Sequence, residues 1–373
     1  MTMFFIIGLI LLFVALIPYF IYLFGISFGK KPTDAGFPEE YPKISIIMSA
    51  YNEEQVIGNR VVNLMQCHYP RDSYEIIFID DCSSDNTLSC AKTCLEESGI
   101  AFRIIANTKR LGTNRSYNHA IKLAQYPIII TTDADVFFDP DALNYLIGRL
   151  ERDPKIAAVT GELRPLSNEN NTTKLEGAYR SYYGRMCDWE SAVDSTYNFN
   201  GALVAFRTDL IRRIDDKRGS DDANTAFEAI RKGYRAVYEM RAIVFEEISP
   251  SFRAQYRQKI RRAKRLIEAT LANLDLLIMN RPFTRFFYPL RLFIYICTPV
   301  LFFTSLFLII IGLYYISPVI LIVLLGFALG IGIVGRQNLL NAFVVNQFYL
   351  VAGLLNMGKD TRTWESTSKK GSE

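Results

Sequence analysis

The stretch Thr131-Thr132-Asp133-Ala134-Asp135 places two carboxylates at positions i and i+2, directly after the apolar run Pro127-Ile128-Ile129-Ile130. That run is rich in β-branched residues and too short to span a membrane, so it predicts a buried strand. Open α/β sheets bind ligands at the C-terminal ends of their strands. Two acids at such an end can approach one hard divalent cation, which commonly shares its oxygen ligands with substrate phosphates. The pair indicates a metal–phosphate site, and the simpler alternative is a turn with two solvated acids.

The elements around this pair alternate between strands and helices. This rhythm predicts a mostly parallel sheet covered by helices on both faces. Short polar residues just before Thr87 are typical of a helix start, because their side chains can cap free backbone N–H groups. The expected strands are Ile44–Met48, Glu75–Ile79, Arg103–Ile105 and Ile128–Thr132, and the expected helices are Glu53–Gln66, one beginning near Thr87, and Asn114–Ala124.

Polar and acidic residues follow several of these strands, at the edge where parallel strands end. Acids that gather at one crevice repel one another unless a cation or hydrogen-bond donors compensate them. This clustering is the argument for a ligand site rather than a set of solvated turns. The residues expected at the edge are Tyr51, Asn52, Glu53, Asp80, Asp81, Asp133 and Asp135.

Three motifs in this order resemble the nucleotide-sugar half of the family 2 glycosyltransferases. They are Ser49-Ala50-Tyr51-Asn52-Glu53-Glu54, Ile79-Asp80-Asp81-Cys82-Ser83-Ser84-Asp85-Asn86-Thr87 and Thr132-Asp133-Ala134-Asp135. The resemblance runs from Lys43 to Arg265 and implies an α/β GT-A domain, inversion at the anomeric carbon and a divalent cation, Mn²⁺ or Mg²⁺.

The resemblance also implies roles for individual residues on the donor side. Tyr51, Glu53 and Asp81 would hold the nucleobase and ribose. Asp133 would contact the nucleotide, and Asp135 would ligate the metal on the diphosphate. Gly112 and Asn118 match donor-pocket positions of the family, and Arg115 either faces the diphosphate or is a solvated helix charge.

The acceptor side is expected in the second half of the domain. Phe199-Asn200-Gly201-Ala202 resembles the family's acceptor-floor motif, with Ala202 in place of a hydroxyl residue, and Gly201 leaves room for a close approach. Ser220-Asp221-Asp222 precedes a helix expected from Ala223 to Lys232 and aligns with the family's T-E-D motif. The resemblance makes Asp222 the general base, with Asp221 beside the acceptor, because direct displacement needs a carboxylate that takes the proton of the attacking hydroxyl. The alternative is that both acids only favour the helix N-terminus.

A basic segment follows this domain. Gln258-Lys259-Ile260-Arg261-Arg262 resembles the Q-x-x-R-W motif of membrane synthases, with Arg262 replacing the tryptophan. Gln258, Arg261 and Arg262 are expected near the donor phosphates. The other interpretation is an interfacial helix attracted to anionic lipid, and both can hold at once.

Apolar segments lie at both ends of the chain. Met3 to Phe28 is long enough to span a bilayer, and the lysines Lys30 and Lys31 that follow it favour the cytoplasmic side. Segments near Leu292–Ile316, Pro318–Gly335 and Leu339–Met357 are further candidates. If all of them cross, the basic tail lies outside, so we expect one to be interfacial or re-entrant and the tail to be cytosolic. Trp364-Glu365-Ser366-Thr367-Ser368-Lys369 resembles an element that closes over the nucleotide in related synthases, or is a disordered tail.

The expected organisation is a multi-pass protein of the cell membrane with a cytosolic catalytic domain. It comprises a transmembrane helix (1–29), a linker (30–42), the GT-A domain (43–250), basic interfacial helices (251–285), a transmembrane region (286–357) and a cytosolic tail (358–373). A formal charge of +4 is too small to argue for nucleic acid. The six cysteines lack paired metal spacing, and five of them fit reduced thiols of a cytosolic domain.

The function expected from these features is transfer of a sugar from a nucleoside-diphosphate sugar, UDP-linked by expectation. The acceptor is either a growing polysaccharide, as in hyaluronan-, chitin- and poly-N-acetylglucosamine-type synthases, or a membrane lipid, as in ceramide or polyprenyl-phosphate glycosyltransferases. The motif at Gln258 and the C-terminal spans favour the polymer, whereas Arg262 and the small number of spans favour the lipid. A membrane scaffold or transport component without catalysis is the alternative of a different class.

Overall fold

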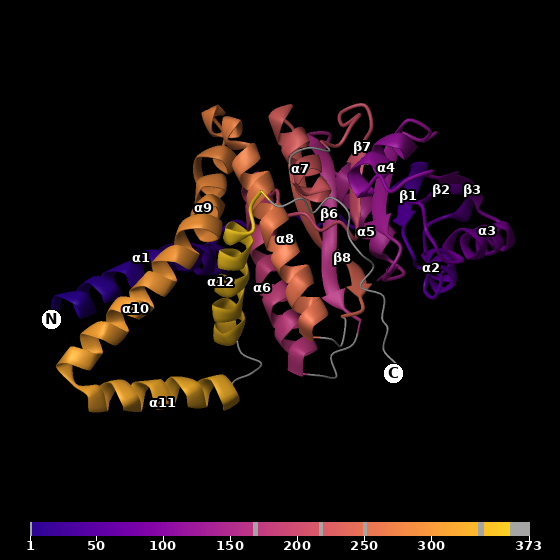
Figure 1. Cartoon of the computed structure of the whole chain (residues 1–373). Coiled ribbons are helices and arrows are strands. Elements are labelled where there is room, and N and C mark those ends of the chain that lie inside the picture. Colours follow the sequence, from indigo (N-terminus) through magenta and orange to yellow (C-terminus); the bar gives the residue numbers. More distant parts are fainter. Residues whose placement is uncertain (1, 167–170, 216–218, 249–251, 335–338, 359–373) are drawn as a thin grey trace. The chain divides into compact units, whose positions relative to one another are not determined.

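The computed structural model describes residues 2–166, 171–215, 219–248, 252–334 and 339–358 of the chain (Figure 1). The chain divides into two compact units. The sheet unit comprises Lys31–Leu166 and Cys187–Gln255, and the helical unit comprises Met1–Lys30, Ser167–Met186 and Tyr256–Lys359.

Within the described residues, the sheet unit contains one sheet of eight strands, in the order β3-β2-β1-β4-β7-β6-β8-β5. The strands β3, β2, β1 and β4 are parallel, β7 runs antiparallel to β4 and β6, and β8 pairs in parallel with β6 and antiparallel with β5. Because β2 and β4 flank β1 in parallel, their C-terminal ends meet at one edge. The strands are β1 (Ile44–Ala50), β2 (Tyr74–Asp80), β3 (Ala101–Ala106), β4 (Ile128–Asp133), β5 (Val136–Phe138), β6 (Ile156–Pro165), β7 (Val204–Arg207) and β8 (Arg235–Glu246).

Helices cover both faces of this sheet, as the alternating sequence pattern predicts. Ile44, Ile46 and Met48 of β1 belong to one apolar cluster with side chains of α2, α3 and α5. Ile47 points to the opposite face and is also fully buried. The helices of the sheet unit are α2 (Ile57–Met65), α3 (Thr87–Ser98), α4 (Thr113–Ile121), α5 (Ala142–Glu151) and α7 (Asp221–Arg231), with a 3₁₀ turn at Arg71–Ser73. Helix α2 begins at Ile57 rather than at Glu53, and α7 begins at Asp221 rather than at Ala223.

The segment that precedes β1 is fixed to the sheet unit through its backbone. Arg149 of α5 donates from Nη1 to the carbonyl of Thr33 at 2.8 Å. An ideal Cβ on Gly148 would lie 2.3 Å from the carbonyl oxygen of Gly36, so only glycine permits this approach. The rings of Phe37 and Tyr145 meet edge to face, with centroids 5.0 Å apart. The expected linker is therefore docked along residues 33–37.

The helical unit contains long apolar helices. A continuous helix from Phe283 to Ile316 contains two π-helical turns, Phe283–Phe287 and Phe293–Cys297, on either side of α9 (Tyr288–Leu292), and it ends with α10 (Thr298–Ile316). It starts earlier than the span expected near Leu292. The other helices are α1 (Thr2–Phe28), α6 (Asn171–Val193, which ends in the sheet unit), α8 (Phe252–Ala272), α11 (Pro318–Val334) and α12 (Leu339–Leu355), with a 3₁₀ turn at Leu274–Ile278.

Helices α1 and α10 pack closely through glycine. An ideal Cβ on Gly312 would lie 2.6 Å from the backbone nitrogen of Phe5, and one on Gly8 would lie 3.0 Å from the carbonyl oxygen of Ser305. Such small residues let backbones approach in membrane helix pairs.

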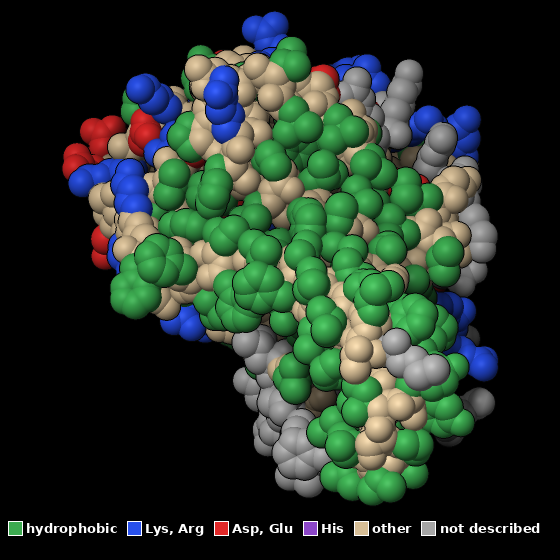
Figure 2. Space-filling view, turned by 90° about the vertical axis from the view of Figure 1, so that its left-hand side faces the viewer, with side chains coloured by type: hydrophobic (Ala, Val, Ile, Leu, Met, Phe, Trp, Pro, Cys, Tyr) green, Lys and Arg blue, Asp and Glu red, His purple; other side chains and the backbone are tan. Residues whose placement is uncertain are grey.

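Hydrophobic side chains gather on the outward face of α1 and α10 (Figure 2). Examples are Phe13 and Phe20 on α1, and Phe307 on α10, all more than half exposed. By length and composition, α1 and the helix Phe283–Ile316 are the two described helices that can cross a membrane.

Candidate active site

The two acids of the Asp133-Ala134-Asp135 motif lie where β4 ends and β5 begins. Asp133 is the last residue of β4 and is paired in register with Ser49 of β1. Ala134 is buried in the turn, whereas both acids are partly exposed. The expected location of the pair, at the C-terminal end of a buried parallel strand, is confirmed.

Asp133 and Asp222 face the same point above Gly201. An ideal Cβ on Gly201 would lie 3.9 Å from Oδ2 of Asp133 and 4.0 Å from Oδ2 of Asp222. A Cβ at position 201 would therefore be in van der Waals contact with both carboxylates. The structure thus brings together acids from β4 and from α7 beside the glycine that was expected to leave room for a ligand.

Asp222 is held at the start of α7 by two hydrogen bonds. Its Oδ1 accepts from the backbone nitrogen of Ala223 at 2.8 Å and from the hydroxyl of Ser220, which precedes the helix. Oδ2 is the oxygen that faces Gly201. The carboxylate is thus held at the helix start through Oδ1, while Oδ2 lies on the side of Gly201. Asp221 belongs to the same helix turn, and its side chain lies outside the described part of the chain.

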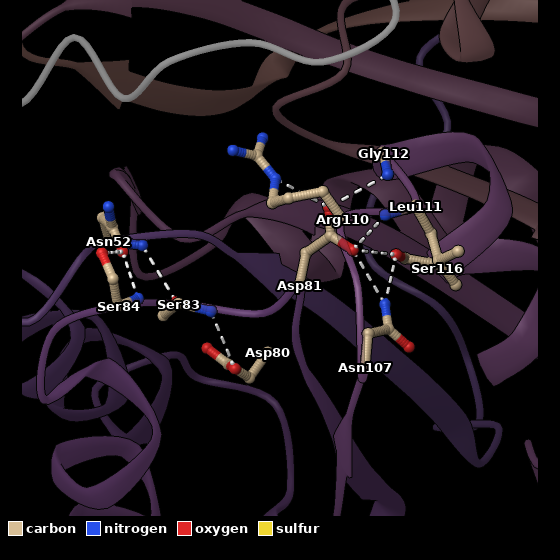
Figure 3. Close-up of polar contacts among 10 residues, drawn as sticks. All are labelled: Asn52, Asp80, Asp81, Ser83, Ser84, Asn107, Arg110, Leu111, Gly112 and Ser116. Atoms are coloured by element: carbon tan, nitrogen blue, oxygen red, sulfur yellow. Dashed lines mark hydrogen bonds and ion pairs between the residues drawn. The ribbon is translucent and has the colours of Figure 1, made fainter.

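The carboxylate of Asp81 organises the loop between β3 and α4 (Figure 3). Oδ1 accepts from the backbone nitrogen of Leu111 at 2.9 Å, and Oδ2 accepts from that of Gly112 at 3.0 Å. Three side chains also donate to this carboxylate, which is only 4% exposed: Asn107 at 2.9 Å, Ser116 at 3.3 Å and Arg110 at 3.4 Å. Asp81 therefore serves the protein itself as the acceptor that shapes the expected donor pocket.

Arg110 covers the ring of Tyr51. Its guanidinium carbon lies 3.3 Å from the ring centroid, while Nε points to Asp81. Arg110 belongs to none of the sequence motifs and was not predicted. Its position two residues before Gly112, in the loop between the motifs, is the feature of the sequence that could have indicated it.

Two turns with positive φ shape the same edge. Asn52 has φ of 55° and Cys82 has φ of 66°, a conformation that non-glycine residues rarely adopt. Asn52 donates from its backbone to Ser83 Oγ at 3.0 Å and accepts from the backbone of Ser84 at 2.8 Å (Figure 3). Asp80 accepts from the backbone of Ser83 at 3.1 Å. The two loops thus hold each other, and Glu53, which follows Asn52, is buried.

The remaining donor-side residues are placed on α4. Gly112 is the residue before the helix and has φ of 80°, which favours glycine. Asn118 uses its amide on the backbone of Ile214, donating from Nδ2 and accepting at Oδ1, both at 2.8 Å. This contact ties α4 to the segment before α7. The side chain of Arg115 is exposed.

A model of the family "Glycosyl transferase family 2" matches residues 45–213, a range that contains all three donor-side motifs. This match covers less than half of the chain, and it confirms the expected resemblance to the family for those residues.

Curated relatives of this glycosyltransferase domain include poly-beta-1,6-N-acetyl-D-glucosamine synthases. The one from Staphylococcus aureus (strain COL) is 26% identical over 242 residues, which cover 64% of this chain and 57% of the relative. The one from Staphylococcus epidermidis is 26% identical over 226 residues, covering 59% of this chain and 54% of the relative. The chain thus matches little more than half the length of these relatives.

A solved structure with the same fold is the mannosyltransferase PcManGT from Pyrobaculum calidifontis, in complex with GDP-Man and Mn²⁺. Its TM-score is 0.80 at 24% identity, over 94% of this chain and 98% of that chain. Together with the family match, this supports the expected GT-A-like α/β fold, a mostly parallel sheet with flanking helices.

The acids of the glycosyltransferase domain fit a cation that is shared with a substrate. Among the described residues no group of three or more His, Cys, Asp or Glu side chains could hold a metal. Two carboxylates provide only part of a metal's ligands, so a cation held by Asp133 and Asp135 would take the others from water and phosphate, as Mg²⁺ and similar ions do.

The predicted residues Gln258, Arg261 and Arg262 lie on α8 of the helical unit. Gln258 and Arg261 are partly exposed, and Arg262 is exposed. The tail motif Trp364–Lys369 lies outside the described residues.

Proposed function

We propose that the protein is a membrane-integrated inverting glycosyltransferase that uses a nucleoside-diphosphate sugar and a divalent cation. The observation that carries this proposal is the pair of carboxylates, Asp133 and Asp222, that face one point above Gly201. One belongs to the motif expected to hold the donor, and the other is the expected general base. A donor and an acceptor bound on either side of Gly201 would meet between them.

The donor nucleotide would occupy the edge formed by Tyr51, Glu53, Asp81, Gly112 and Asp133. Because the guanidinium of Arg110 covers one face of the Tyr51 ring, a nucleobase would stack on the opposite face of the ring or on the guanidinium plane, which is a donor-only group. The sequence favours UDP as the nucleotide, whereas the mannosyltransferase with the same fold is bound to GDP-Man. Both nucleotides therefore belong in the first assay.

Asp135, with Asp133 beside it, would hold Mn²⁺ or Mg²⁺ against the diphosphate. The bound cation would offset the negative charge that develops on the leaving diphosphate. The relative with this fold that contains Mn²⁺ supports use of a divalent ion, and the choice between Mn²⁺ and Mg²⁺ is a matter for measurement.

Asp222 would take the proton of the acceptor hydroxyl as that oxygen bonds to the anomeric carbon. The bond from that carbon to the diphosphate breaks, the diphosphate leaves with the electron pair, and the configuration inverts. Asp222 suits this role because Ser220 and Ala223 fix one oxygen while the other faces the reaction space. Gly201 and Asp221 would border the acceptor.

A growing polysaccharide is the first candidate acceptor. The poly-beta-1,6-N-acetyl-D-glucosamine synthases among the relatives support it, as does the motif Gln258-x-x-Arg261. Gln258, Arg261 and Arg262 would then contribute donors to the diphosphate from α8.

A membrane lipid is the second candidate, favoured by a buried arginine in the helical unit. Arg291 is 1% exposed, lies over the rings of Tyr22 and Tyr183, and donates from Nη1 to Tyr295 at 3.2 Å. Arg291 stands between the two π-helical turns, and such turns often mark functional sites. Charged groups inside a membrane are rare and commonly functional. A guanidinium with tyrosine hydroxyls suits the phosphate of a lipid acceptor better than a neutral sugar chain.

We also propose the domain organisation expected from the sequence, with apolar helices at both ends and a cytosolic catalytic domain between them. Helix α1 and the helix Phe283–Ile316 support this organisation by length and composition. The exposed basic residues of α8, such as Arg253 and Arg257, would face the headgroups of anionic lipid.

The deciding experiment uses the full chain in lipid with Mn²⁺ or Mg²⁺ and a panel of UDP- and GDP-sugars. Release of nucleoside diphosphate is measured, any product is sized, and Asp222→Asn is assayed in parallel. Long products that require Asp222 support the polymer, and a single organic-extractable adduct supports the lipid. Asp222→Asn should still bind the nucleotide with metal while turnover falls by a factor on the order of 10² to 10⁴. Nucleotide binding without metal-dependent release from any donor would instead favour the non-catalytic scaffold.

A further inference from the structure

Arg60 is a buried arginine directly behind the Asp133-Ala134-Asp135 motif. It belongs to α2 and is fully buried. Its Nη2 donates to Thr132 Oγ1 at 3.0 Å, and Thr132 immediately precedes Asp133. Its guanidinium carbon lies 4.0 Å from the ring centroid of Phe138, at the end of β5. Arg60 thus touches the strands on both sides of the turn that carries the two acids.

The guanidinium of Arg60 retains its positive charge at neutral pH. Burial lowers the pKa of Arg60 to about 10, and Cys67 and the carboxylates of Asp133 and Asp135 oppose that shift. Its Nε has no hydrogen-bond partner among the described residues. A buried charge is costly unless other charges or dipoles compensate it. The hydrogen bond to Thr132 places the guanidinium at the strand end that carries Asp133, so Asp133 and Asp135 are the carboxylates that contribute to this compensation.

The charge of Arg60 has opposite effects on the binding of a free cation and on the binding of a nucleotide. The charge of Arg60 cancels part of the attraction that two carboxylates offer to a divalent ion. The same charge attracts a diphosphate that enters beside the acids. When metal and diphosphate bind together, the weaker attraction of the metal and the stronger attraction of the diphosphate act on the same complex. Their effects on its affinity largely offset each other.

We propose that Arg60 is a positioning residue that makes the Asp133–Asp135 site bind metal and donor diphosphate together rather than metal alone. The inference rests on the proposed function, because it needs a diphosphate beside these acids. Arg60, which lies outside the donor motifs, would thus couple the binding of the metal to the binding of the donor diphosphate.

The substitution Arg60→Met tests this, because the surrounding hydrogen bonds survive the loss of the guanidinium. Thr132 Oγ1 also donates to the carbonyl of Ala202 at 2.8 Å. Asn63, which accepts from Arg60 Nη1, also accepts from the backbone nitrogen of Phe138 at 2.8 Å and donates to its carbonyl at 2.9 Å. Methionine has a similar length and packs well against an aromatic ring such as Phe138.

Five dissociation constants are measured for the full chain in detergent. They are Mn²⁺ alone by the electron paramagnetic resonance signal of free Mn²⁺, UDP and GDP in EDTA by calorimetry, and each nucleotide with saturating Mn²⁺. In Arg60→Met, Mn²⁺ alone should bind more tightly and the metal-free nucleotide more weakly, each by a factor on the order of ten. Affinity for the nucleotide with Mn²⁺ should change much less. Arg60→Lys keeps the charge, so its affinities for Mn²⁺ alone and for the metal-free nucleotide should be close to those of the wild type.

Opposite changes in two affinities distinguish this role from a damaged fold, which would weaken both. Arg149→Met is the matched control. Arg149 is also buried, but it donates to the carbonyl of Thr33 and not to a residue beside the two acids. Arg149→Met should leave all five dissociation constants unchanged. If Arg60→Met shifts both single-ligand affinities in the same direction, or neither, the inference is wrong. If the wild-type chain binds neither nucleotide even with Mn²⁺, the proposed function itself fails.

Discussion

At the scale of single residues, the site depends on carboxylates whose two oxygens have different tasks. Asp222 uses Oδ1 for Ser220 and Ala223 and turns Oδ2 toward Gly201. Asp81 instead uses both oxygens for the protein. Two aspartates named by the same resemblance therefore have different surroundings: Asp81 lies within a loop that both of its oxygens bind, and Oδ2 of Asp222 lies beside Gly201.

We predict that Asp81→Asn weakens nucleotide binding by more than tenfold through the shape of the loop. An amide turns one acceptor into a donor, which must then face the backbone N–H of Leu111 or Gly112. A buried donor left unpaired costs about 1–3 kcal/mol. The dissociation constant of UDP or GDP with Mn²⁺, measured by calorimetry, checks this.

Ser116→Ala is the matched control for Asp81→Asn. It removes the 3.3 Å hydrogen bond to the same carboxylate and the 3.0 Å bond that Ser116 accepts from Asn107, whose Nδ2 still donates to Asp81. Its effect on the dissociation constant should stay within about threefold, in line with about 0.5 kcal/mol for a weak bond. Equal loss in the two variants, or none in Asp81→Asn, would contradict the loop-shaping role.

At the scale of elements, the local sequence pattern predicts the strands but not the conformation of the loops that connect the elements. Ile128–Ile130 is a continuous β-branched run and Ile44–Met48 is apolar except for Ser45, which is typical of buried parallel strands, and both strands were predicted. The start of α2 was predicted at Glu53, but residues 51–54 form a turn with Asn52 at φ of 55°. Partners from another loop, Ser83 and Ser84, hold that turn, and no local signal reveals them.

Arg60 and the position of β7 illustrate the same limit. In sequence Arg60 is typical of the polar face of a surface helix, and only its contacts with Thr132 and Phe138, far along the chain, bury it. Likewise, the antiparallel insertion of β7 between β4 and β6 depends on pairings across long sequence distances. The site acids were predictable because they sit at strand and helix ends. Their electrostatic environment was not.

The packing of α1 on α10 yields a prediction at the element scale. Gly312→Ala should destabilise the helical unit by about 1–3 kcal/mol, because the new Cβ meets the backbone of Phe5, which cannot rotate away. Thermal denaturation of the detergent-solubilised chain measures the change as a lower midpoint. Gly326→Ala in α11 is the control, since nothing lies within 4 Å of an ideal Cβ there. A Gly312→Ala protein as stable as Gly326→Ala would show that the two helices do not depend on this contact.

At the scale of the whole molecule, the number of membrane crossings decides where the chain's basic tail lies. If residues from about 30 onward are cytosolic, as proposed, the helix Phe283–Ile316 carries the chain outward to Ser317. The apolar helices α11 and α12 follow Ser317. The tail is cytosolic if these two helices together cross the membrane an odd number of times.

The contact between α12 and α8 indicates how the chain returns. An ideal Cβ on Gly353, near the end of α12, would lie 3.0 Å from the backbone nitrogen of Lys264 in α8. Because α8 is basic, with exposed arginines such as Arg257 and Arg262, we expect it at the cytosolic surface. The end of α12 is then on the cytosolic side as well, so α11 and α12 together make one net crossing.

We therefore predict that a reporter fused after Glu373 is cytosolic. A fluorescent protein that folds only in the cytosol should be bright there, and alkaline phosphatase, active only outside, should be silent. The same pair fused after Ser317 should give the opposite result, which controls for expression. Phosphatase activity at both positions would mean that the chain crosses the membrane an even number of times after Ser317. The prediction would then be wrong, and so would the assumption behind it that α8 lies at the cytosolic surface.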